Sequence, residues 1–368
     1  MEIKAKRESL LATLYWTQSI VERRNTMPIL ANVLFEADKG FIRVTATDLE
    51  VGVRGEVEGD VAREGTVTVN AKKIYEIIRE VPNEQVQIKR LENDWVEIRS
   101  GKSVFKIVGM DAKEFPQFPK FDSKALSTTP ASTMREMIER TLFSVSTDET
   151  GYSLNGVFIE QGDGTNVRMV ATDGHRLAFE EKAVGTFGLA KGVILPRKGL
   201  AELKKLLESG TEGVVSLGFK ENMALVTKDK IELFMRLIDG DFPDYTKVIP
   251  KGNPNIVKLE HDELLQALRR VSILSSERYK GIRMEFTDGK VGISANNPDL
   301  GEGVEKIEAE YKGKPMSIGF NARYLIDVLG VLGGDGEIDI ELKDELSPSV
   351  IRKAGVDSYL YVLMPMRL

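Results

Sequence analysis

The sequence predicts an α+β protein built from three tandem copies of one module, each with two helices on antiparallel sheet. The first observation is a repeated tripeptide at the end of an apolar, β-rich run: Ala-Thr-Asp at 46–48 and 171–173, and Ala-Asn-Asn at 295–297. The third residues of these tripeptides lie 125 and 124 positions apart. Three modules of about 125 residues fill a chain of 368 residues, so the repeat accounts for the whole length.

A second repeated feature has the same spacing as the tripeptide. Lys73, Lys198 and Arg323 each stand near the start of a helical pattern, at successive intervals of 125 residues. Two helices are expected in each module, one at its beginning and one in its middle, because apolar residues recur there at helical spacing. The predicted first helices are residues 7–22, 131–146 and 261–274, and the predicted second helices are residues 71–81, 197–208 and 321–331.

Strands are predicted between the helices, where short runs rich in Val and Ile alternate with polar residues. Residues 86–89 and 95–98 are typical, and the polar stretch 92–94 would join them as a turn. Proline-containing stretches at 115–120 and 242–254 interrupt the patterns. The predicted domains are residues 1–120, 128–248 and 254–368.

Composition describes a globular protein and excludes several kinds of chemistry. Apolar residues make up 42% of the chain and charged residues 29%, which suffices for a core in each module. The absence of cysteine excludes disulfides and thiol catalysis, and two histidines leave little material for a zinc site, so no metal or cofactor is expected. No apolar stretch is long enough to span a membrane, and residues 1–4 show no signal-peptide pattern. A cytoplasmic location is expected.

Positive charge is concentrated in the predicted helices, although the whole chain carries a net charge of −6. Lys and Arg outnumber Asp and Glu in the six helical ranges taken together, and the acidic excess lies elsewhere. In the helix 197–208, Arg197 and Lys204 stand seven residues apart, as do Lys198 and Lys205, which is close to two helical turns. A single helix with basic residues on its outer side is most simply explained as a surface exposed to solvent. The recurrence of such helices in the modules instead favours sequence-independent contact with nucleic-acid phosphates.

One motif favours a different interpretation. Thr-Asp-Gly-His-Arg at 172–176 could form a catalytic site, with His175 as base and Asp173 as the residue that orients it. No nucleophile motif or phosphate-binding loop accompanies it. The first module has Ala-Thr-Asp at 46–48 without a following histidine. A repeated Thr-Asp at the end of a strand is more simply a turn in which the carboxylate accepts backbone hydrogen bonds.

Short motifs along the entire chain carry a resemblance to a known family. They include Met-Pro-Ile-Leu-Ala-Asn-Val at 27–33, Ala-Thr-Asp-Gly-His-Arg-Leu-Ala at 171–178, Phe-Pro-Asp-Tyr at 242–245 and Met-Pro-Met-Arg-Leu at 364–368. In kind and order these motifs resemble the bacterial sliding clamp family, the β subunit of DNA polymerase III. The resemblance implies that two chains, each with three clamp modules, close a ring around duplex DNA, with helices inside and sheets outside. It also implies a non-catalytic processivity factor whose partners include the replicative polymerase and an ATP-driven clamp loader.

The resemblance further implies three sets of site residues. Contact with DNA is expected from Arg24, Lys72, Tyr152, Arg197 and Lys198, and the helical stripe adds Lys204 and Lys205. A pocket for short partner peptides is expected from Leu154, Thr172, Gly174, His175, Arg176, Leu177, Pro243, Lys247, Val248, Asn321, Tyr324, Leu346, Val362, Leu363, Met364, Pro365, Met366, Arg367 and Leu368. Ring closure as a homodimer is expected from Lys73, Ile77, Phe105 and Ile107 of one chain against Ile273 and Leu274 of the next.

Two alternatives to the clamp remain open. A clamp-like repeat scaffold that does not surround DNA would have the same modules but would tolerate reversal of the helix charges. An enzyme that uses Asp173 and His175 would lose its catalytic activity when His175 is replaced. A clamp would have no such activity and would lose only peptide binding. The loop 148–153 departs from the family pattern, because it is acidic and has a single tyrosine.

Overall fold

The computed structural model describes residues 1–21, 27–118, 120–122, 126–148, 152–210, 212–276 and 279–367, with only the backbone at Tyr152. By packing, the chain divides into two compact units. The first unit comprises Met1–Ala131 and Lys198–Leu237, and the second comprises Ser132–Arg197 and Ile238–Leu368. This division does not follow the three predicted domains, since it passes through the middle third of the chain.

The described part of the first unit contains two antiparallel sheets. The five-stranded sheet has the order β5 (Gly59–Arg63), β1 (Glu2–Lys6), β7 (Gln85–Arg90), β8 (Val96–Ser100) and β9 (Ser103–Ile107). The nine-stranded sheet has the order β10 (Gly109–Met110), β6 (Gly65–Asn70), β2 (Asn32–Asp38), β3 (Phe41–Thr47), β4 (Val51–Val57), β18 (Ile231–Arg236), β17 (Met223–Lys228), β16 (Val214–Lys220) and β11 (Ser127–Pro130).

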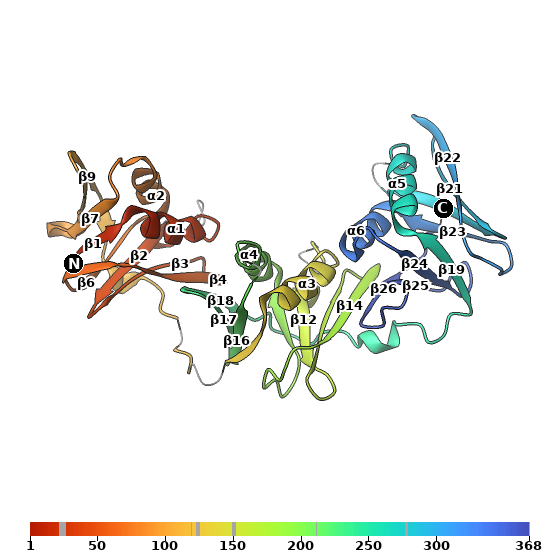
Figure 1. Ribbon diagram of the computed structural model, residues 1–368, viewed down its shortest axis with the longest axis horizontal. Coiled ribbons are helices and arrows are strands. Elements are labelled where there is room, and N and C mark those ends of the chain that lie inside the picture. Colours follow the sequence, from red (N-terminus) through yellow and green to blue (C-terminus); the bar gives the residue numbers. More distant parts are fainter. Residues whose placement is uncertain are drawn as a thin grey trace. The chain divides into compact units, whose positions relative to one another are not determined.

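Helices α1 (Arg7–Thr17) and α2 (Ala71–Glu80) pack against each other and against this sheet (Figure 1). Helix α1 approaches β4 so closely that a Cβ atom at Gly55 would lie 2.5 Å from the side chain of Thr13. Asn70 caps α2, since its side chain accepts a hydrogen bond from the backbone N–H of Lys73. Helix α1 ends five residues before the predicted end, where the hydroxyl of Thr17 donates to the carbonyl of Leu14. Such local hydrogen bonds compete with helix continuation.

The described part of the second unit also contains two antiparallel sheets. The eight-stranded sheet has the order β15 (Val193–Pro196), β12 (Gly156–Gln161), β13 (Asn166–Thr172), β14 (Arg176–Ala183), β26 (Tyr359–Leu363), β25 (Ser349–Lys353), β24 (Glu337–Leu342) and β19 (Asn255–Glu260). The four-stranded sheet has the order β22 (Gly301–Glu308), β21 (Lys290–Asn297), β20 (Gly281–Thr287) and β23 (Met316–Asn321).

The remaining helices are α3 (Ala131–Leu142), α4 (Arg197–Glu208), α5 (His261–Ser272) and α6 (Ala322–Leu332). Helices α5 and α6 pack together over a core that contains Leu268, Phe286 and Leu329. The structure confirms two helices near the predicted positions in each module, but α3 and α5 end earlier than predicted.

Strand pairing joins stretches that were predicted to belong to different domains. Strand β4 pairs with β18, so that Val53 lies opposite Leu233. Strand β14 pairs with β26, so that Leu177 lies opposite Val362. The nine-stranded and the eight-stranded sheet therefore each continue across a predicted domain boundary, which explains why packing divides the chain differently from the repeat.

The repeated Thr-Asp tripeptide forms the same turn twice. The carboxylate of Asp48 accepts hydrogen bonds from the backbone N–H groups of Glu50 and Val51. The carboxylate of Asp173 accepts them from the N–H groups at positions 175 and 176. The residue after each aspartate is left-handed, with φ of 80° at Leu49 and 86° at Gly174. The interpretation of this motif as a turn is confirmed.

Candidate functional site

A pocket of about 140 Å³ lies in the second unit, where the turn between β13 and β14 meets the chain beyond β26. Its walls are mostly apolar. They are formed by Leu154, Thr172, Gly174, Arg176, Leu177, Pro243, Tyr245, Val248, Val362 and Met364. All of these residues except Tyr245 belong to the set that the sequence predicted for partner peptides. The structure thus brings together side chains from four separate stretches of the chain.

The sheet positions the floor of this pocket, and the segment 242–249 covers the adjacent sheet face. Leu177 and Val362 are directly opposite each other on β14 and β26. Tyr245 packs against them, and its hydroxyl donates a 2.5 Å hydrogen bond to Glu160. Burial, and then this hydrogen bond, raise the pKa of Tyr245, so the phenol stays protonated. Sequence reasoning missed Tyr245, although it belongs to the Phe-Pro-Asp-Tyr motif that carried the resemblance.

The guanidinium group of Arg176 links several elements of the second unit. Its Nε donates to Asp173 at 3.0 Å, Nη1 to Asp327 at 2.7 Å, and Nη2 to the carbonyl of Phe143 at 2.7 Å. The guanidinium also lies over the ring of Tyr324, 4.2 Å from its centroid. Burial by itself lowers the pKa of Arg176, but nearby Tyr361, Asp327 and Asp173 outweigh it and raise the pKa. The guanidinium of Arg176 is therefore occupied by these acceptors within the protein, and the side chain supports the pocket wall.

Other residues of the predicted pocket set lie outside this lining, for different physical reasons. Leu363 is fully buried in the core of the second unit, because alternate residues of β26 face opposite sides of the sheet. Asn321 caps α6 with its side chain, and Lys247 forms an ion pair with Asp244 at 2.9 Å. Leu346 is 73% exposed and stands apart from the lining.

The chain after β26 is held by the backbone at the rim of the pocket. The N–H of Met364 donates to the carbonyl of His175 at 2.9 Å, and the N–H of Met366 donates to that of Gly319 at 2.8 Å. Tyr324 lies beside Arg176, as described above, while Pro365 and Arg367 continue this terminal segment. Leu368, Arg24 and the side chain of Tyr152 lie outside the described residues.

The arrangement of Asp173 and His175 does not form an acid–base pair. The carboxylate of Asp173 is occupied by two backbone N–H groups and by Arg176. Among the described residues, no hydrogen bond joins it to the His175 ring, which is exposed. No cluster of three metal-ligating side chains occurs in the part of the chain that the structure describes. In that same part, no helix is long and apolar enough to cross a membrane.

A groove of about 570 Å³ runs between α1 and α2 in the first unit. It brings Lys72 and Lys73 together with Arg79 and with two tyrosines, Tyr15 and Tyr75. Both lysines lie near one carboxylate, that of Glu76, at 3.7 and 3.0 Å, so the groove keeps a positive excess. Tyr15 is 59% exposed. Sequence reasoning missed the tyrosines, because aromatic residues on an amphipathic helix are usually assigned to the core.

The predicted basic stripe on α4 is weaker than the sequence suggested. Lys198 forms an ion pair with Asp48, whose side chain is only 3% exposed, so Lys198 ties α4 to the turn after β3. Lys204 lies 3.6 Å from Glu208, and Lys205 lies 2.7 Å from Glu202. The expectation of four equally available cations is therefore corrected. Arg197 and Lys205 are exposed, whereas Lys198 has a structural partner.

Four of the six residues predicted for ring closure lie at open sheet edges or beside them, and the other two lie on a helix. Phe105 and Ile107 belong to β9, the edge strand of the five-stranded sheet, and Phe105 is 38% exposed. Ile273 directly follows α5 and is 74% exposed, and Leu274 lies near Gly303 of the edge strand β22. Lys73 and Ile77 lie on α2, where Ile77 is half-buried.

Comparison with known proteins gives one consistent family. Three models of the DNA polymerase III beta subunit match the chain in succession: its N-terminal domain at residues 1–119, its central domain at 128–244 and its C-terminal domain at 246–367. The chain is 36% identical to the beta sliding clamp of Pseudomonas aeruginosa and 35% identical to that of Vibrio cholerae, with full coverage of both sequences in each case.

Solved structures agree with the sequence comparison. The crystal structure of the DNA polymerase III subunit beta from Pseudomonas aeruginosa matches with a TM-score of 0.94 at 35% identity, over 100% of both chains. A sliding clamp from Bartonella birtlesii bound to griselimycin matches with a TM-score of 0.94 at 33% identity, again over 100% of both chains.

Proposed function

Because the chain belongs to the family of bacterial sliding clamps, the beta subunit of DNA polymerase III, we propose that two copies form a ring around duplex DNA and tether the replicative polymerase and other partners to it. The family is a non-catalytic accessory subunit. Its fold is three α+β clamp modules, which we assign to residues 1–120, 128–248 and 254–368. Action on DNA during replication supports a cytoplasmic location.

The observation that carries the tethering role is the apolar pocket beside β14 and β26. Its volume of about 140 Å³ suits one or two apolar side chains of a peptide rather than a whole small protein. Met364 at its rim has an unbranched, flexible side chain, which can adapt to different peptides. The pocket is formed before any partner arrives, since Arg176 and Tyr245 hold its walls through partly buried hydrogen bonds. Little ordering of the protein is then required on binding.

We assign duplex contact to the exposed cations of the helices. The groove between α1 and α2 presents Lys72 and Arg79 beside an exposed Tyr15, and α4 presents Arg197 and Lys205, with Lys204 half-buried between them. Several of these cations have a carboxylate within 4 Å, so their attraction for phosphate is moderate and sensitive to salt. Moderate contact suits a ring that must slide, because topology rather than affinity keeps it on DNA.

We assign ring closure to two of the exposed sheet edges. Strand β9 in the first unit and strand β22 in the second are both edge strands with exposed apolar side chains, Val104 and Phe105 on the one and Val304 on the other. Open apolar edges invite pairing with another chain. Pairing of β9 from one copy with β22 of the next would be head to tail, and two such contacts would close a ring.

The experiment that tests this function distinguishes a ring that encircles DNA from a protein that binds to the DNA surface. The protein is loaded by the clamp loader of its own replication system onto a nicked circular plasmid, and retention is followed by gel filtration. The circle should retain the protein at high salt, and linearisation of the plasmid should release it. Retention on linear DNA at high salt, or failure to remain on the circle, would remove the ring from the proposal.

Two further measurements address the alternatives. Small-angle scattering with mass determination should give twice the chain mass of 41.0 kDa and the distance distribution of a hollow ring. A scaffold that does not surround DNA would remain active in processive synthesis after Lys204→Glu and Lys205→Glu, whereas a clamp should lose processivity and Lys113→Glu should not matter. His175→Ala should weaken peptide binding, and loss of a turnover would instead favour an enzyme.

A further inference from the structure

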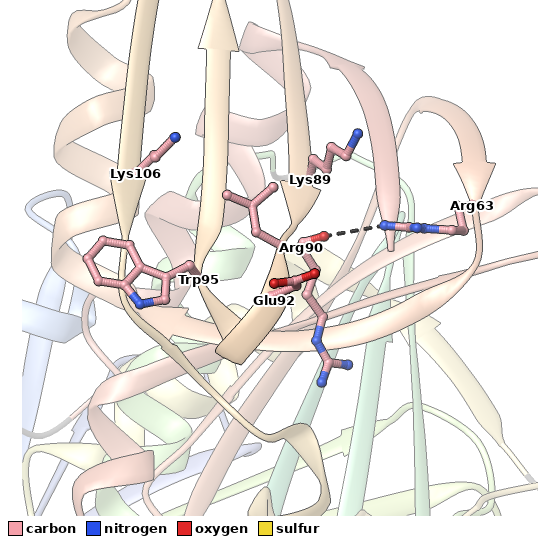
Figure 2. A pocket seen from close by; sticks show the side chains of 7 residues that line it. Arg63, Lys89, Arg90, Glu92, Trp95 and Lys106 are labelled. Atoms are coloured by element: carbon pink, nitrogen blue, oxygen red, sulfur yellow. Dashed lines mark hydrogen bonds between the residues drawn. The ribbon is translucent and has the colours of Figure 1, made fainter.

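A second hollow, of about 690 Å³, lies in the first unit beside the turn that joins β7 and β8. We call it the basic pocket. It is lined by Arg63, Lys89, Arg90, Leu91, Glu92, Trp95 and Lys106. In Figure 2, Trp95 and Lys106 stand on one side, Lys89 and Arg63 on the other, and the carboxylate of Glu92 lies between them. The proposed clamp function uses none of these side chains.

Three of the four cations that line the basic pocket, Arg63, Lys89 and Lys106, belong to one row across the five-stranded sheet. In the strand pairing, Arg63 is opposite Glu2, Glu2 is opposite Lys89, Lys89 is opposite Glu97, and Glu97 is opposite Lys106. Residues that are opposite each other in a regular ladder share one face of a sheet, so Glu2, Lys89, Glu97 and Lys106 alternate in charge along that face. Arg63 extends this row next to an irregularity in the pairing of β1 with β5. Cations recur at every second strand, about 10 Å apart.

The cations of this row project farther into solvent than its carboxylates. The side chains of Lys89 and Lys106 are 40% and 56% exposed, whereas those of Glu2 and Glu97 are 24% and 9% exposed. The ion pairs are also long, at 3.4 Å for Lys89 with Glu2 and 3.9 Å for Lys106 with Glu97. An approaching ligand therefore meets the ammonium groups first, while the recessed carboxylates hold them in place.

The two arginines of the basic pocket differ in role. Arg90 donates to the carbonyl of Thr66 at 2.9 Å and pairs with Asp94, and its guanidinium turns away from the other cations in Figure 2. Arg63 donates to the carbonyl of Arg90 at 3.3 Å, as the dashed line shows, and is otherwise exposed. Among the described residues, Arg63 forms no ion pair with a carboxylate. It is therefore available to an anion from outside.

Trp95 gives the basic pocket an exposed aromatic wall. Its side chain is 43% exposed, which is unusual for the largest apolar residue. The backbone that carries it is a tight turn, with left-handed φ angles of 54° and 62° at Asn93 and Asp94. The N–H of Leu91 closes the turn with a 2.7 Å hydrogen bond to the carbonyl of Trp95. The turn thus places Trp95 beside the row of cations.

We propose that the basic pocket binds single-stranded nucleic acid, with a base stacked on Trp95 and phosphates held by Arg63, Lys89 and Lys106. A flat aromatic wall next to separated cations is the arrangement that single-strand binding proteins use. A duplex cannot use it equally well, because its bases already stack on each other and expose their faces only at the ends. This site is separate from the helix groove that we assign to duplex DNA, but Lys106 lies on β9, the strand that we assign to ring closure.

Glu92 distinguishes nucleic acid from an acidic protein segment as the occupant. Its exposed carboxylate lies in the middle of the basic pocket, where it would repel the carboxylates of an acidic peptide (Figure 2). A nucleobase instead offers amino groups that a carboxylate can accept hydrogen bonds from, while the phosphates lie farther out near the cations. The charge pattern of the pocket thus fits a ligand with both donors and phosphates.

The test uses the full-length protein with Trp16→Phe, which leaves Trp95 as the one tryptophan, since the chain has two. A single-stranded oligonucleotide of about eight nucleotides should quench the Trp95 fluorescence, and the same sequence as a duplex should do so much less. In parallel, anisotropy of a labelled oligonucleotide should show about tenfold weaker binding for Trp95→Ala and near-normal binding for Trp95→Phe. Lys106→Gln should weaken binding and reduce its salt dependence.

Control variants show whether oligonucleotide binding depends on the basic pocket itself. Lys113→Gln removes a cation that is 90% exposed in the same unit, and it should change nothing. Lys72→Gln alters the helix groove and should leave the Trp95 quenching intact. Equal quenching by duplex and single strand, or unchanged affinity in folded Trp95→Ala, would overturn the proposal. Displacement of the oligonucleotide by poly-glutamate at a lower concentration than by unlabelled strand would overturn it in favour of an acidic protein partner.

Discussion

Removal of the Arg176 guanidinium should destabilise the second unit without changing the first. The side chains of Arg176, Asp173 and Asp327 are 9%, 14% and 27% exposed, so Arg176→Ala would leave two carboxylates with little access to water. Loss of one partner from a buried ion pair costs about 3–5 kcal/mol. Because Asp327 retains some exposure, we take the lower end, about 3 kcal/mol.

The assay must report on the second unit itself. Both tryptophans, Trp16 and Trp95, belong to the first unit, so indole fluorescence would follow the wrong part of the molecule. Amide hydrogen exchange of peptides from α6 and β14 reports local free energy directly, and a loss of 3 kcal/mol makes exchange about a hundredfold faster. The melting temperature of this unit, with roughly 200 residues, should fall by about 6–12 °C.

Two matched variants show whether the reasoning is right. Arg176→Lys keeps the charge, but one ammonium group cannot reach three separated acceptors, so an intermediate loss is expected. Arg176→Met combined with Asp327→Leu removes both partners and should recover much of the stability. Exchange in α6 that accelerates less than fivefold in Arg176→Ala would refute the view that this guanidinium holds the unit together, as would equal acceleration in first-unit peptides.

Three further predictions follow from the same structure. Burial raises the pKa of Glu180 despite Arg140, so the folded state holds its proton more tightly than the unfolded chain, whose pKa is about 4.3. The free energy of unfolding that Glu180 contributes therefore falls as pH rises from about 4.3 through the raised pKa. The melting-temperature advantage of Glu180→Gln should grow across that window, and a constant difference would contradict this. Met364→Ala should weaken an apolar-anchored peptide about tenfold in calorimetry, with Leu346→Ala as the unaffected control. Phe105→Glu should shift sedimentation toward the monomer, whereas Val214→Glu, at an exposed position on β16, should not.

Local patterns predicted the elements well, because helices and hairpins depend on nearby residues. The helix predicted over residues 71–81 is present as α2, Ala71–Glu80, with Ile74 and Ile78 buried. Helix ends were less accurate, since the hydroxyl of Thr17 ends α1 through a hydrogen bond that propensity alone does not include. The pairing of β4 with β18 could not be predicted, because it joins strands about 180 residues apart.

The pocket was predicted as a set by resemblance, but the role of each member needed the structure. Leu363 and Val362 are neighbours in sequence, yet they face opposite sides of β26, and a one-residue error in register exchanges core for pocket. Lys198 has the same pattern as Lys205 on α4, but Asp48 approaches it from a distant turn. Contacts with residues that are distant in sequence cannot be read from the spacing of residues along a helix.

The continuation of a sheet from β4 into β18 limits how this protein can be cut or recombined. A fragment that ended at the first repeat boundary would expose β4 along its full length, and the remaining piece would expose β18. Each edge would present Val53 or Leu233 next to unpaired backbone groups, which is the feature that drives strands of different molecules to associate. Exchange of whole modules between related chains would thus require matched edge strands, and the repeat, although regular in sequence, is not a set of interchangeable parts.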